Sequence, residues 1–489
     1  MELFRIHGGA RLEGRKSLTA HKPTQIAPIP SVLHIPVQQH VGEPAEPIVH
    51  VGDHVRKGQL IAASKKKISA PIHASTSGKI ARIGDHQAPH PSGLPVLTIT
   101  LEPDGKDEWT DLPPPIDLEK ATSDEIAARV SDAGVVGMGG AAFPAAVKLN
   151  LGQRSKLETL IINGAECEPY LTCDDRLMQE RPEKIVLGIR AMMQALRVQK
   201  SLVAIEGNKP QAVAAMSREC AKAIGIEVVE VPARYPMGSA KHLVQALTGK
   251  ETPAKSRIAD LGVLVHNVGT AYAVYEALYL GRPLISRIVT VSGHAIKNPG
   301  NYEVLIGTSI AYLVDLCGGM TSKPDQLFMG GPMMGIPLPD LDVPVVKGTL
   351  GVLALKAEKM HAQPVMPCIS CGSCVIVCPA GLTPLEMASR IKHDDVEGAA
   401  KIGLNDCISC GSCNYVCPSH IPLVQYFNYG KGFLAERAKE KSNQERMKAL
   451  AERRSKRDED RRKELEKKHE EAKRRHAESI PQSGLESAT

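Results

Sequence analysis

The sequence predicts a multidomain chain of α/β plus β architecture, followed by a helical, cysteine-rich module and a charged tail. Strand-like and helix-like segments alternate over residues 121–280, which is typical of a doubly wound α/β domain. Short alternating apolar segments surround glycines over 31–102 and predict a β domain. Two nearly identical cysteine runs begin at residues 368 and 407. These three observations fix the order of the predicted domains.

Composition narrows the class of protein. The chain has 489 residues, 43% of them hydrophobic, and a formal charge of +6. That length predicts several domains, and so mild a charge does not argue for nucleic acid. The N-terminus lacks the plan of a signal peptide, and no stretch approaches the ~20 apolar residues that span a bilayer. We therefore expect a cytoplasmic protein that reaches a membrane only through a partner.

Eight of the twelve cysteines lie in the two runs, each of the form C-x2-C-x2-C-x3-C-P. Three cysteines at this spacing wrap one [4Fe–4S] cube, and the fourth ligates the other cube. Disulfides suit small secreted scaffolds, and zinc fits the third cysteine poorly. The runs therefore predict two clusters, one held by Cys368, Cys371, Cys374 and Cys417 and the other by Cys378, Cys407, Cys410 and Cys413. The remaining thiols are expected to be buried and structural, and they are Cys167, Cys173, Cys220 and Cys317.

The segment between the runs, TPLEMASRIKHDDVEGAAKIG, predicts a helix that Gly403 ends. The module resembles the helical dicluster ferredoxin modules of respiratory enzymes more than the small β-rich ferredoxins. Two clusters that exchange ligands form a short electron wire, and a wire needs a source and an acceptor.

A glycine loop upstream reads GVVGMGGAAFPAAVKLN from residue 134. The preceding segment predicts a helix that Ser123 caps and Gly134 closes. Glycines let backbone amides approach a ligand, and the following helix would direct its positive end at an anion. An ordinary tight turn explains the loop equally well. The glycines in question are Gly137, Gly139 and Gly140.

An acidic loop, GAECEPYLTCDDR, follows a strand that ends at Asn163. Open α/β sheets place ligands at such strand ends. Asn163 is a candidate hydrogen-bond partner of an isoalloxazine edge, and Glu166 and Glu168 are candidate acceptors for ribose or amide donors. The alternative is a solvated acidic turn. A later strand ends in the polar turn His266–Asn267.

With these motifs together, the chain resembles the RnfC family, the C subunits of the Rnf (Rsx) electron-transport complexes, over about residues 1–430. GVVGMGGAAFPAAVK, NGAECEPYLTCDDR, YPMGSAKHLVQALTGKE, GGPMMG and both cysteine runs carry the resemblance. The central domain is similar to the NADH- and FMN-binding subunit of respiratory complex I. The resemblance implies FMN and two [4Fe–4S] clusters as cofactors and NADH as substrate.

The complex I relative also implies roles for single residues. Phe143 matches an aromatic that stacks on the nicotinamide nucleotide, and Glu168 an acid near NADH. The residues implied to surround FMN are Gly137, Gly139, Gly140, Lys148, Asn163, Glu166, Tyr235, Gly238 and Asn267. The chain departs from this pattern at Ala165, which replaces an aspartate, and at Ser239 and Ala240, which replace two glutamates. These departures leave the nucleotide pose open.

We expect five parts. They are an N-terminal arm with a barrel-sandwich hybrid domain (1–102), an FMN/NADH-binding α/β domain (121–280), a β-grasp domain (281–360), a ferredoxin module (361–430) and a charged tail, helical or disordered (431–489). The linker 102–120 is rich in proline and aspartate. The β-grasp label follows from the family resemblance.

The resemblance implies an electron-input subunit, and hence an oxidoreductase subunit, of an ion-translocating complex. It would move electrons between NADH, FMN and the clusters, and pass them to partner subunits at the cytoplasmic face of the bacterial inner membrane. One alternative is a docking and electron-wire subunit without its own NADH site. Another is an adaptor related to sodium-pumping NADH:quinone reductase, which the cysteine runs disfavour.

Overall fold

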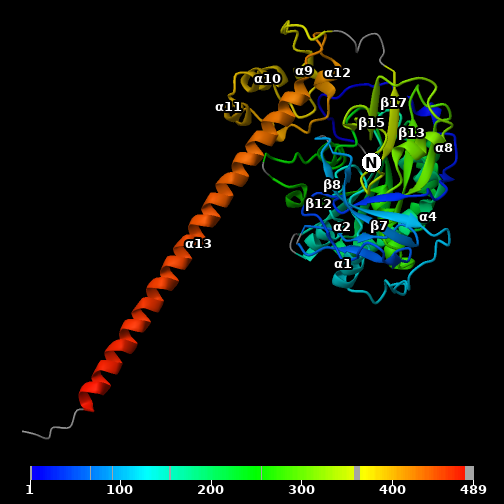
Figure 1. Cartoon of the computed structure of the whole chain (residues 1–489). Coiled ribbons are helices and arrows are strands. Elements are labelled where there is room, and N and C mark those ends of the chain that lie inside the picture. The colour runs from blue at the N-terminus through cyan, green and yellow to red at the C-terminus, as the bar shows by residue number, and fades with distance from the viewer. Residues whose placement is uncertain are drawn as a thin grey trace, which may run out of the picture. The chain divides into compact units, whose positions relative to one another are not determined.

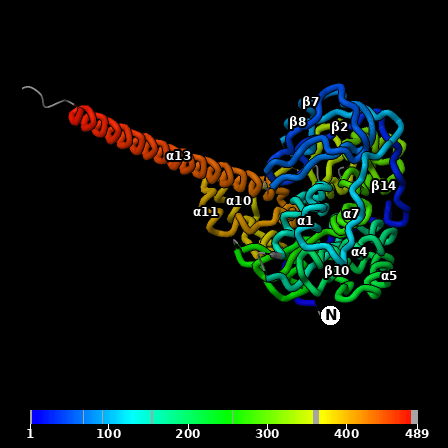
Figure 2. Tube along the Cα trace, turned by 90° about the horizontal axis from the view of Figure 1, so that it is seen from below, coloured from blue at the N-terminus to red at the C-terminus, as the bar shows by residue number. Residues whose placement is uncertain are grey.

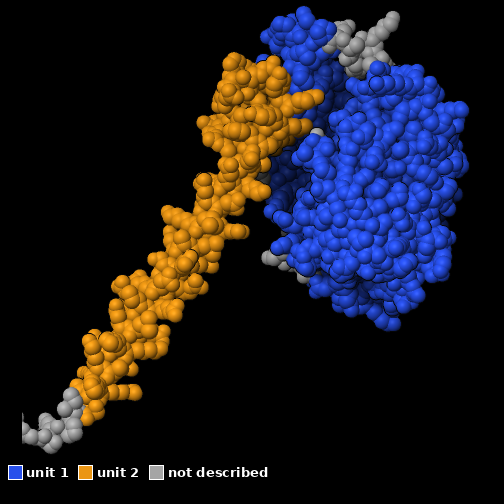
Figure 3. All heavy atoms as spheres, viewed as in Figure 1, with its two compact units in different colours: residues 1–385, 406–424 blue, residues 386–405, 425–489 orange. Residues whose placement is uncertain are grey.

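The computed structural model describes residues 3–66, 68–90, 92–153, 156–254, 256–356 and 364–479. The chain divides into two compact units, coloured separately in Figure 3. Unit 1 comprises residues 1–385 and 406–424, and unit 2 comprises residues 386–405 and 425–489. All the candidate cofactor residues lie in unit 1.

The centre of unit 1 is a four-stranded parallel sheet in the order β11-β10-β9-β12. Helix α6 covers one face, and α1, α2, α4, α5 and α7 cover the other (Figures 1 and 2). The strands are β9 (Thr159–Gly164), β10 (Lys200–Glu206), β11 (Ile226–Val231) and β12 (Val263–Asn267). The helices are α1 (Ser123–Asp132), α2 (Ala145–Leu149), α3 (Cys173–Glu180), α4 (Pro182–Leu196), α5 (Pro210–Cys220), α6 (Ala240–Thr248) and α7 (Val268–Tyr279).

The strand order explains where a ligand can bind. From β9 the chain builds outward through β10 to β11, and β12 then pairs with the opposite edge of β9. Ligands of open α/β sheets bind beyond the carboxyl ends of the strands at such a switch point. Asn163 and Asn267 occupy those ends and are in register.

Helix α1 begins one residue earlier than the sequence suggested. Its N-cap is Thr122, which accepts from the backbone N–H of Glu125 while the Glu125 carboxylate accepts from Thr122 N–H. Ser123, the predicted cap, is instead the first helical residue. This reciprocal capping box satisfies two backbone donors, which a cap at Ser123 would not do. Gly134 follows the helix with a left-handed φ of 64°, as predicted.

The N-terminal β domain packs two antiparallel sheets around a buried aliphatic core. Figure 2 shows β2, β7 and β8 side by side. One sheet has the order β2-β8-β7-β4, with β2 (Leu33–Pro36), β4 (His54–Val55), β7 (Gly78–Gln87) and β8 (Pro95–Pro103). The other contains β3 (Glu46–Pro47), β5 (Leu60–Ala63) and β6 (Ile72–His73).

A third β region is a mixed six-stranded sheet in the order β1-β14-β13-β17-β15-β16. Helix α8 (Ile310–Leu316) packs on it through Leu313 and Val314. Its strands are β1 (Gln25–Ile26), β13 (Ser286–Ser292), β14 (Gly300–Leu305), β15 (Gln326–Met329), β16 (Ile336–Pro337) and β17 (Gly351–Leu355). Strand β1 precedes the N-terminal β domain in sequence, and it pairs with β14, which follows the parallel-sheet domain.

The cysteine module of unit 1 contains two short helices that pack together, α9 (Ser373–Val377) and α12 (Ser412–Tyr415). Each helix follows a glycine in the left-handed region, Gly372 at φ 75° and Gly411 at φ 78°. The two runs therefore repeat in backbone geometry as well as in sequence.

Unit 2 contains α10 (Pro384–Lys392, from Glu386 on), α11 (Val396–Lys401) and most of α13 (Leu423–Glu478). The single helix predicted between the cysteine runs is wrong, because the chain breaks between α10 and α11. Asp394 has a φ of 60°, and Asp395 caps α11 by accepting from Gly398 N–H at 2.8 Å. Helix α13 has 56 residues, so it extends about 84 Å. The tail is helical up to Glu478, and residues 480–489 lie outside the described part.

Within the described ranges, no helix has both the length and the apolar content that crossing a bilayer requires.

Candidate redox cofactor sites

Two asparagines lie at the switch point of the parallel sheet. Asn267 caps α7 by accepting from Gly269 N–H at 2.7 Å, and its amide donates to the Asp174 carboxylate at 2.6 Å. The Asn163 amide donates to the Gly238 carbonyl at 2.8 Å. Both predicted residues are therefore brought together with Gly238, but their amide donors already have protein partners.

The glycine loop lies against Asn267. A Cβ on Gly139 would lie 3.3 Å from Asn267 Cβ, whereas one on Gly140 would meet no atom closer than 3.8 Å. Gly140 has a φ of 97°, and both glycines are exposed. Gly137 instead holds the loop closed, since its N–H donates to the half-buried Phe143 carbonyl at 2.8 Å. The loop thus presents open backbone beside the start of α7, where an anion is favoured.

A buried histidine beside this loop was not among the predicted site residues. His266 is 3% exposed, and neither of its ring nitrogens has a hydrogen-bond partner among the described residues. Burial and the nearby Lys148 ammonium lower its pKa well below the usual value. Lys148 itself donates to the Val265 carbonyl at 3.0 Å. The only sequence signal was a polar His-Asn pair that ends an apolar strand.

These features fit an FMN. Unpaired buried imidazole nitrogens are costly unless a ligand satisfies them. Exposed glycine amides and the N-terminus of α7 suit a phosphate, and the half-buried Lys148 adds positive charge beside His266. The donor set is therefore that of an anionic, hydrogen-bonding cofactor.

The carboxylate of Glu166 faces the protein. It accepts from Asp174 N–H at 2.7 Å and so satisfies a free backbone donor at the start of α3. Glu166 has a φ of 48°, which turns the loop at this residue. The expectation that it accepts from ribose or ligand amide donors is not what this structure shows.

Two buried lysines hold the acidic loop. Lys16 of the N-terminal arm donates to the carbonyls of Glu166, Glu168 and Leu171 at 2.8, 3.0 and 2.6 Å. Lys209 donates to the Ala165 carbonyl at 2.7 Å. Burial, and then the charge of Lys209, lower the pKa of Lys16. Nothing in the sequence indicated that these lysines reach the loop.

Glu168 binds the GGPMMG loop. Its two carboxylate oxygens accept from the N–H groups of Met333 and Met334, each at 3.0 Å. Burial raises its pKa to about 7, although these hydrogen bonds favour the charged form. Gly331 is required here, because a Cβ would lie 2.1 Å from the carboxylate.

Tyr235 points toward the cysteine module. Its hydroxyl donates to the Cys410 carbonyl at 2.6 Å and lies 3.5 Å from the Glu168 carboxylate. Three residues along, the Gly238 N–H lies 3.3 Å from the Cys167 sulfur. The loop 235–238 therefore touches both the acidic loop and a cysteine run.

The eight run cysteines form two groups in space. Burial, and then the nearby Cys407, raise the pKa of Cys378 and of Cys410, and Cys413 lies close to the same three cysteines. For Cys413, burial is the larger cause, and its pKa is raised to about 12. These four are called the inner group below. Such a set of buried and half-buried thiols suits iron, because a bound cation favours the thiolate.

Cys371, Cys374 and Cys417 lie together in the outer group, to which the spacing of the first run also assigns Cys368. Both Cys371 and Cys417 lie near enough to Cys374 to raise its pKa, although burial is the larger cause. Cys368 and Cys371 are exposed. The fourth cysteine of each run thus lies with the other run, which is the grouping the spacing predicted.

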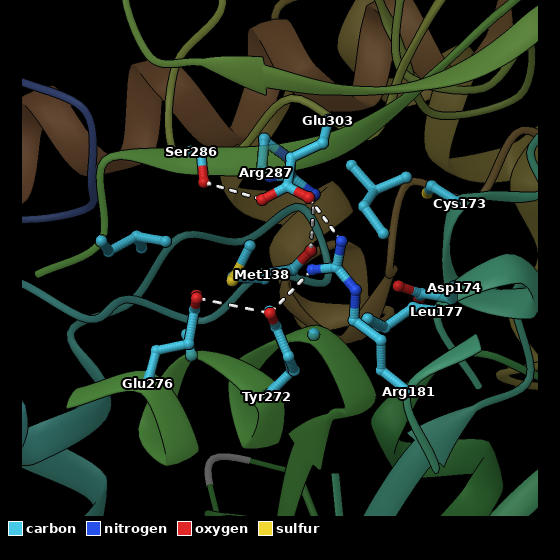
Figure 4. A pocket seen from close by; sticks show the side chains of 14 residues that line it. Met138, Cys173, Asp174, Leu177, Arg181, Tyr272, Glu276, Ser286, Arg287 and Glu303 are labelled. Carbon is cyan, nitrogen blue, oxygen red and sulfur yellow. Dashed lines mark hydrogen bonds and ion pairs between the residues drawn. The ribbon is translucent and has the colours of Figure 1, made fainter. Parts of the chain in front are cut away.

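A small cavity lies behind the glycine loop (Figure 4). Its volume is about 30 Å³, room for water molecules and not for a flavin. Arg181 crosses it, pairs with Glu303, and donates to the Tyr272 hydroxyl at 2.7 Å. Burial raises the pKa of Glu276, on the same wall, to about 7. The network links the junction of α3 and α4 to α7 and β14, and so restrains the elements that lie behind the glycine loop.

Comparison with known proteins agrees with this division. The Nuo51 FMN-binding domain matches residues 130–276, and the RnfC barrel sandwich hybrid domain matches residues 4–106. An SLBB domain matches residues 288–337, and a 4Fe-4S dicluster domain matches residues 367–421. The barrel-sandwich prediction is confirmed. The FMN-binding and dicluster matches support flavin and iron–sulfur cofactors.

Among solved structures, the NAD+-reducing [NiFe]-hydrogenase in its H2-reduced state overlaps 64% of this chain and 63% of its own, at a TM-score of 0.45 and 20% identity. That likeness is too distant to bear on function.

Two curated relatives cover most of the chain. The C subunit of the ion-translocating oxidoreductase complex of Rhodobacter capsulatus is 55% identical over 90% of this chain and 85% of its own. The C subunit of the proton-translocating ferredoxin:NAD(+) oxidoreductase complex of Clostridium ljungdahlii is 45% identical over 87% and 93%. The chain therefore belongs to the RnfC family, the C subunits of ion-translocating oxidoreductase complexes, and is an electron-transfer subunit.

Proposed function

We propose that this chain takes electrons from NADH through an FMN at the switch point and passes them through two [4Fe–4S] clusters to partner subunits. The single observation that carries the proposal is the Tyr235–Cys410 hydrogen bond, which joins the flavin-side loops to the inner cysteine group. Cofactor sites that exchange electrons must be close, and this contact leaves no intervening domain.

Each part of the flavin site has a role in the proposal. The amides of Gly139 and Gly140 and the start of α7 would hold the phosphate of FMN, and Lys148 and His266 would contact its ring system or side chain. FMN, when bound, supplies the change from two-electron hydride chemistry to single electrons. The chain's own residues bind, orient and shield it.

The order of the clusters follows from exposure. The inner group touches the flavin-side loops through Tyr235, and the outer group contains the exposed Cys368 and Cys371. The inner cluster is therefore proposed as the first acceptor, and the outer cluster as the exit toward a partner. The partners are other subunits of the complex, with this chain peripheral at the cytoplasmic face of the inner membrane.

An anaerobic titration of the reconstituted chain with NADH tests the proposal. Flavin absorbance should bleach first, and paramagnetic resonance signals of two reduced clusters should follow. If FMN binds and dithionite reduces the clusters but NADH bleaches nothing, the NADH half of the proposal is wrong.

That outcome would favour a second candidate, a docking and electron-wire subunit without its own nucleotide site. One observation supports it: both oxygens of Glu168, the acid implied to lie near NADH, already accept from Met333 and Met334. Under this candidate, Phe143→Ala leaves NADH-dependent electron transfer in the assembled complex unchanged. Under the first candidate, Phe143→Ala weakens NADH binding.

A further inference from the structure

An N-terminal arm, residues 7–16, connects the flavin-side loops to the inner cysteine group. Ala10 and Tyr235 form an antiparallel bridge, with N–H to O distances of 2.7 and 3.0 Å. The next residue toward the N-terminus, Gly9, donates to the Val377 carbonyl at 2.8 Å. The arm therefore contacts Tyr235 on one side and the residue before Cys378 on the other.

Gly8 brings the arm against the ligand peptide itself. Its φ is 58°, and a Cβ would lie 2.4 Å from the Cys378 carbonyl oxygen. A side chain would have to displace backbone and not a flexible group, so the position requires glycine. The arm thus fixes the peptide of one inner cysteine by direct contact.

Tyr235 fixes the peptide of a second inner cysteine, Cys410. The backbone of Tyr235 is held by Ala10, its ring is 3% exposed, and its hydroxyl donates to the Cys410 carbonyl. Because the backbone of Tyr235 pairs with Ala10 and its hydroxyl pairs with Cys410, the side chain has little freedom to turn away from the cysteine peptide. In a poorly solvated setting, the dipole of that hydroxyl acts on the Cys410 peptide at greater strength than in water.

Two further contacts support the same junction. His242 Nε2 lies 3.0 Å from the carbonyl of Pro379, which follows Cys378. A Cβ on Gly411 would lie 3.0 Å from the Met333 carbonyl. The α/β domain and the GGPMMG loop therefore both hold the loops that carry inner cysteines.

We propose that Tyr235 is a positioning residue for the inner cluster, and that its hydroxyl raises the reduction potential of that cluster. The inference rests on the proposed function, because it needs the inner group to hold a cluster. Reduction adds negative charge, and a donor directed at a ligand peptide stabilises the more negative state. Removing the hydroxyl therefore lowers the potential of one cluster only.

The test uses the full chain with both clusters reconstituted. Tyr235→Phe keeps the ring and removes the donor, and potentiometric titration with paramagnetic resonance reads the two clusters separately. Cys368→Ser, which alters the outer group whichever way the fourth cysteines pair, assigns the signals. The inner signal should move to lower potential while the outer signal stays in place. Tyr302→Phe is the matched control, since Tyr302 is a buried tyrosine on β14.

The other outcomes of this experiment also bear on the positioning role of Tyr235. Loss of the inner signal alone, with the outer kept, also supports a positioning role, whereas equal behaviour of Tyr235→Phe and Tyr302→Phe overturns it. Loss of both signals in Tyr235→Phe overturns it as well, because the effect is then general. If the parent chain shows no cluster signal, the proposed function itself fails. Gly8→Ala, which acts on Cys378, should disturb the same inner signal.

A second, independent cluster of side chains lies between two β regions of unit 1. His34 on β2 and His86 on β7 stack with ring centroids 4.0 Å apart. Asp342, from the chain between β16 and β17, places a carboxylate oxygen 4.0 Å from His86 Nε2. One ligand atom from each residue lies within 4.8 Å of the others.

The histidines have the features of metal ligands. His86 Nε2 is buried and has no hydrogen-bond partner in the described part of the chain. His34 Nδ1 lies 3.3 Å from the Thr100 hydroxyl, an outer contact that orients the ring and leaves Nε2 available.

We infer that His34, His86 and Asp342 bind a divalent transition metal of the zinc class, with solvent as the fourth ligand. Tetrahedral zinc holds its ligand atoms about 3.4 Å apart, so the three side chains must close by roughly 1 Å. The imidazole rings are stacked at an interplanar angle of 15°, so they must also turn until a nitrogen of each ring points at the ion. The Asp342 side chain is 70% exposed and free to make that movement. The ion would join the N-terminal β domain to the six-stranded sheet region.

Equilibrium dialysis of the cluster-loaded chain against micromolar zinc tests the site, with zinc and iron measured in the same samples. The parent should retain about one zinc more than His86→Ala, with iron unchanged in both. His54→Ala removes an exposed histidine of the same sheet and should bind like the parent. Equal zinc in the parent and His86→Ala would overturn the inference, as would zinc gained only at the expense of iron.

Discussion

The ammonium group of Lys16 donates a 2.6 Å hydrogen bond to the carbonyl oxygen of Leu171. The same group binds the Glu166 and Glu168 carbonyls, so one side chain of the N-terminal arm binds three carbonyls of the acidic loop. A cation with three carbonyl partners is hard to replace, because a neutral side chain in its place removes a donor from each of these carbonyls.

Lys16→Met should therefore lower the free energy of unfolding by about 3 kcal/mol and loosen FMN. Denaturant unfolding and the FMN content after gel filtration measure the two effects. Lys22→Met is the control, since Lys22 is exposed and donates to the Pro299 carbonyl at the surface. Equal stability of the two variants would contradict the role given to Lys16.

Glu168 should make stability depend on pH. Its pKa is raised to about 7, so between about pH 4.5 and 7 the folded chain binds a proton that the unfolded chain has lost. Stability from this group is present at low pH and is lost as pH rises through 7, by at most about 3 kcal/mol. Glu168→Gln should remove that component.

Denaturant unfolding of the parent and of Glu168→Gln at pH 5 and pH 8 measures this pH-dependent part of the stability. The difference between the two proteins isolates Glu168 from other groups that titrate in this range, such as Glu276. A variant that loses stability more steeply than the parent as pH rises would show the assignment of sign to be wrong.

Cys417→Ser should alter the outer cluster, although it lies in the second run. The reason is that Cys417 lies beside Cys374 and not with its own run. Paramagnetic resonance of the dithionite-reduced protein should show the inner signal kept and the outer one changed. Cys220→Ser, in a buried thiol of α5, serves as the control. If the inner signal changed instead, each run would hold its own cluster.

Gly372 and Gly411, which occupy equivalent positions in the two runs, should differ in how well they tolerate replacement by alanine. Both have left-handed φ values, so alanine costs about 1–2 kcal/mol at either position. A Cβ at Gly372 meets no neighbouring atom, whereas one at Gly411 lies 3.0 Å from the Met333 carbonyl. Gly411→Ala should therefore lose more stability and more iron than Gly372→Ala. Iron content and thermal unfolding of both variants provide the comparison.

Local patterns predicted much of this molecule. The cysteine spacing alone predicted that Cys378 and Cys417 cross between runs, because ligand exchange is a property of that motif. Strand and helix alternation predicted the parallel sheet and placed Asn163 and Asn267 at its carboxyl edge. These inferences needed only short stretches of chain.

Distant contacts were not predictable in the same way. Met333 lies 165 residues from Glu168, and Cys410 lies 175 residues from Tyr235, and no local rule specifies such pairs. Glu166 was expected to face a ligand, yet its carboxylate accepts from a backbone N–H, because a helix start nearby needed an acceptor. The helix break at Asp394 was missed, since the next aspartate competes locally for backbone donors.

The junction of Gly9, Val377 and Tyr235 also constrains how the chain is made. Ribosomes add about 5–20 residues per second, so the arm emerges tens of seconds before Val377 exists. The arm meets the acidic loop and Tyr235 first, and the contact of Gly9 with Val377 can form only later. Maturation of the inner cluster then depends on a contact between the first part of the chain to be made and a part made much later.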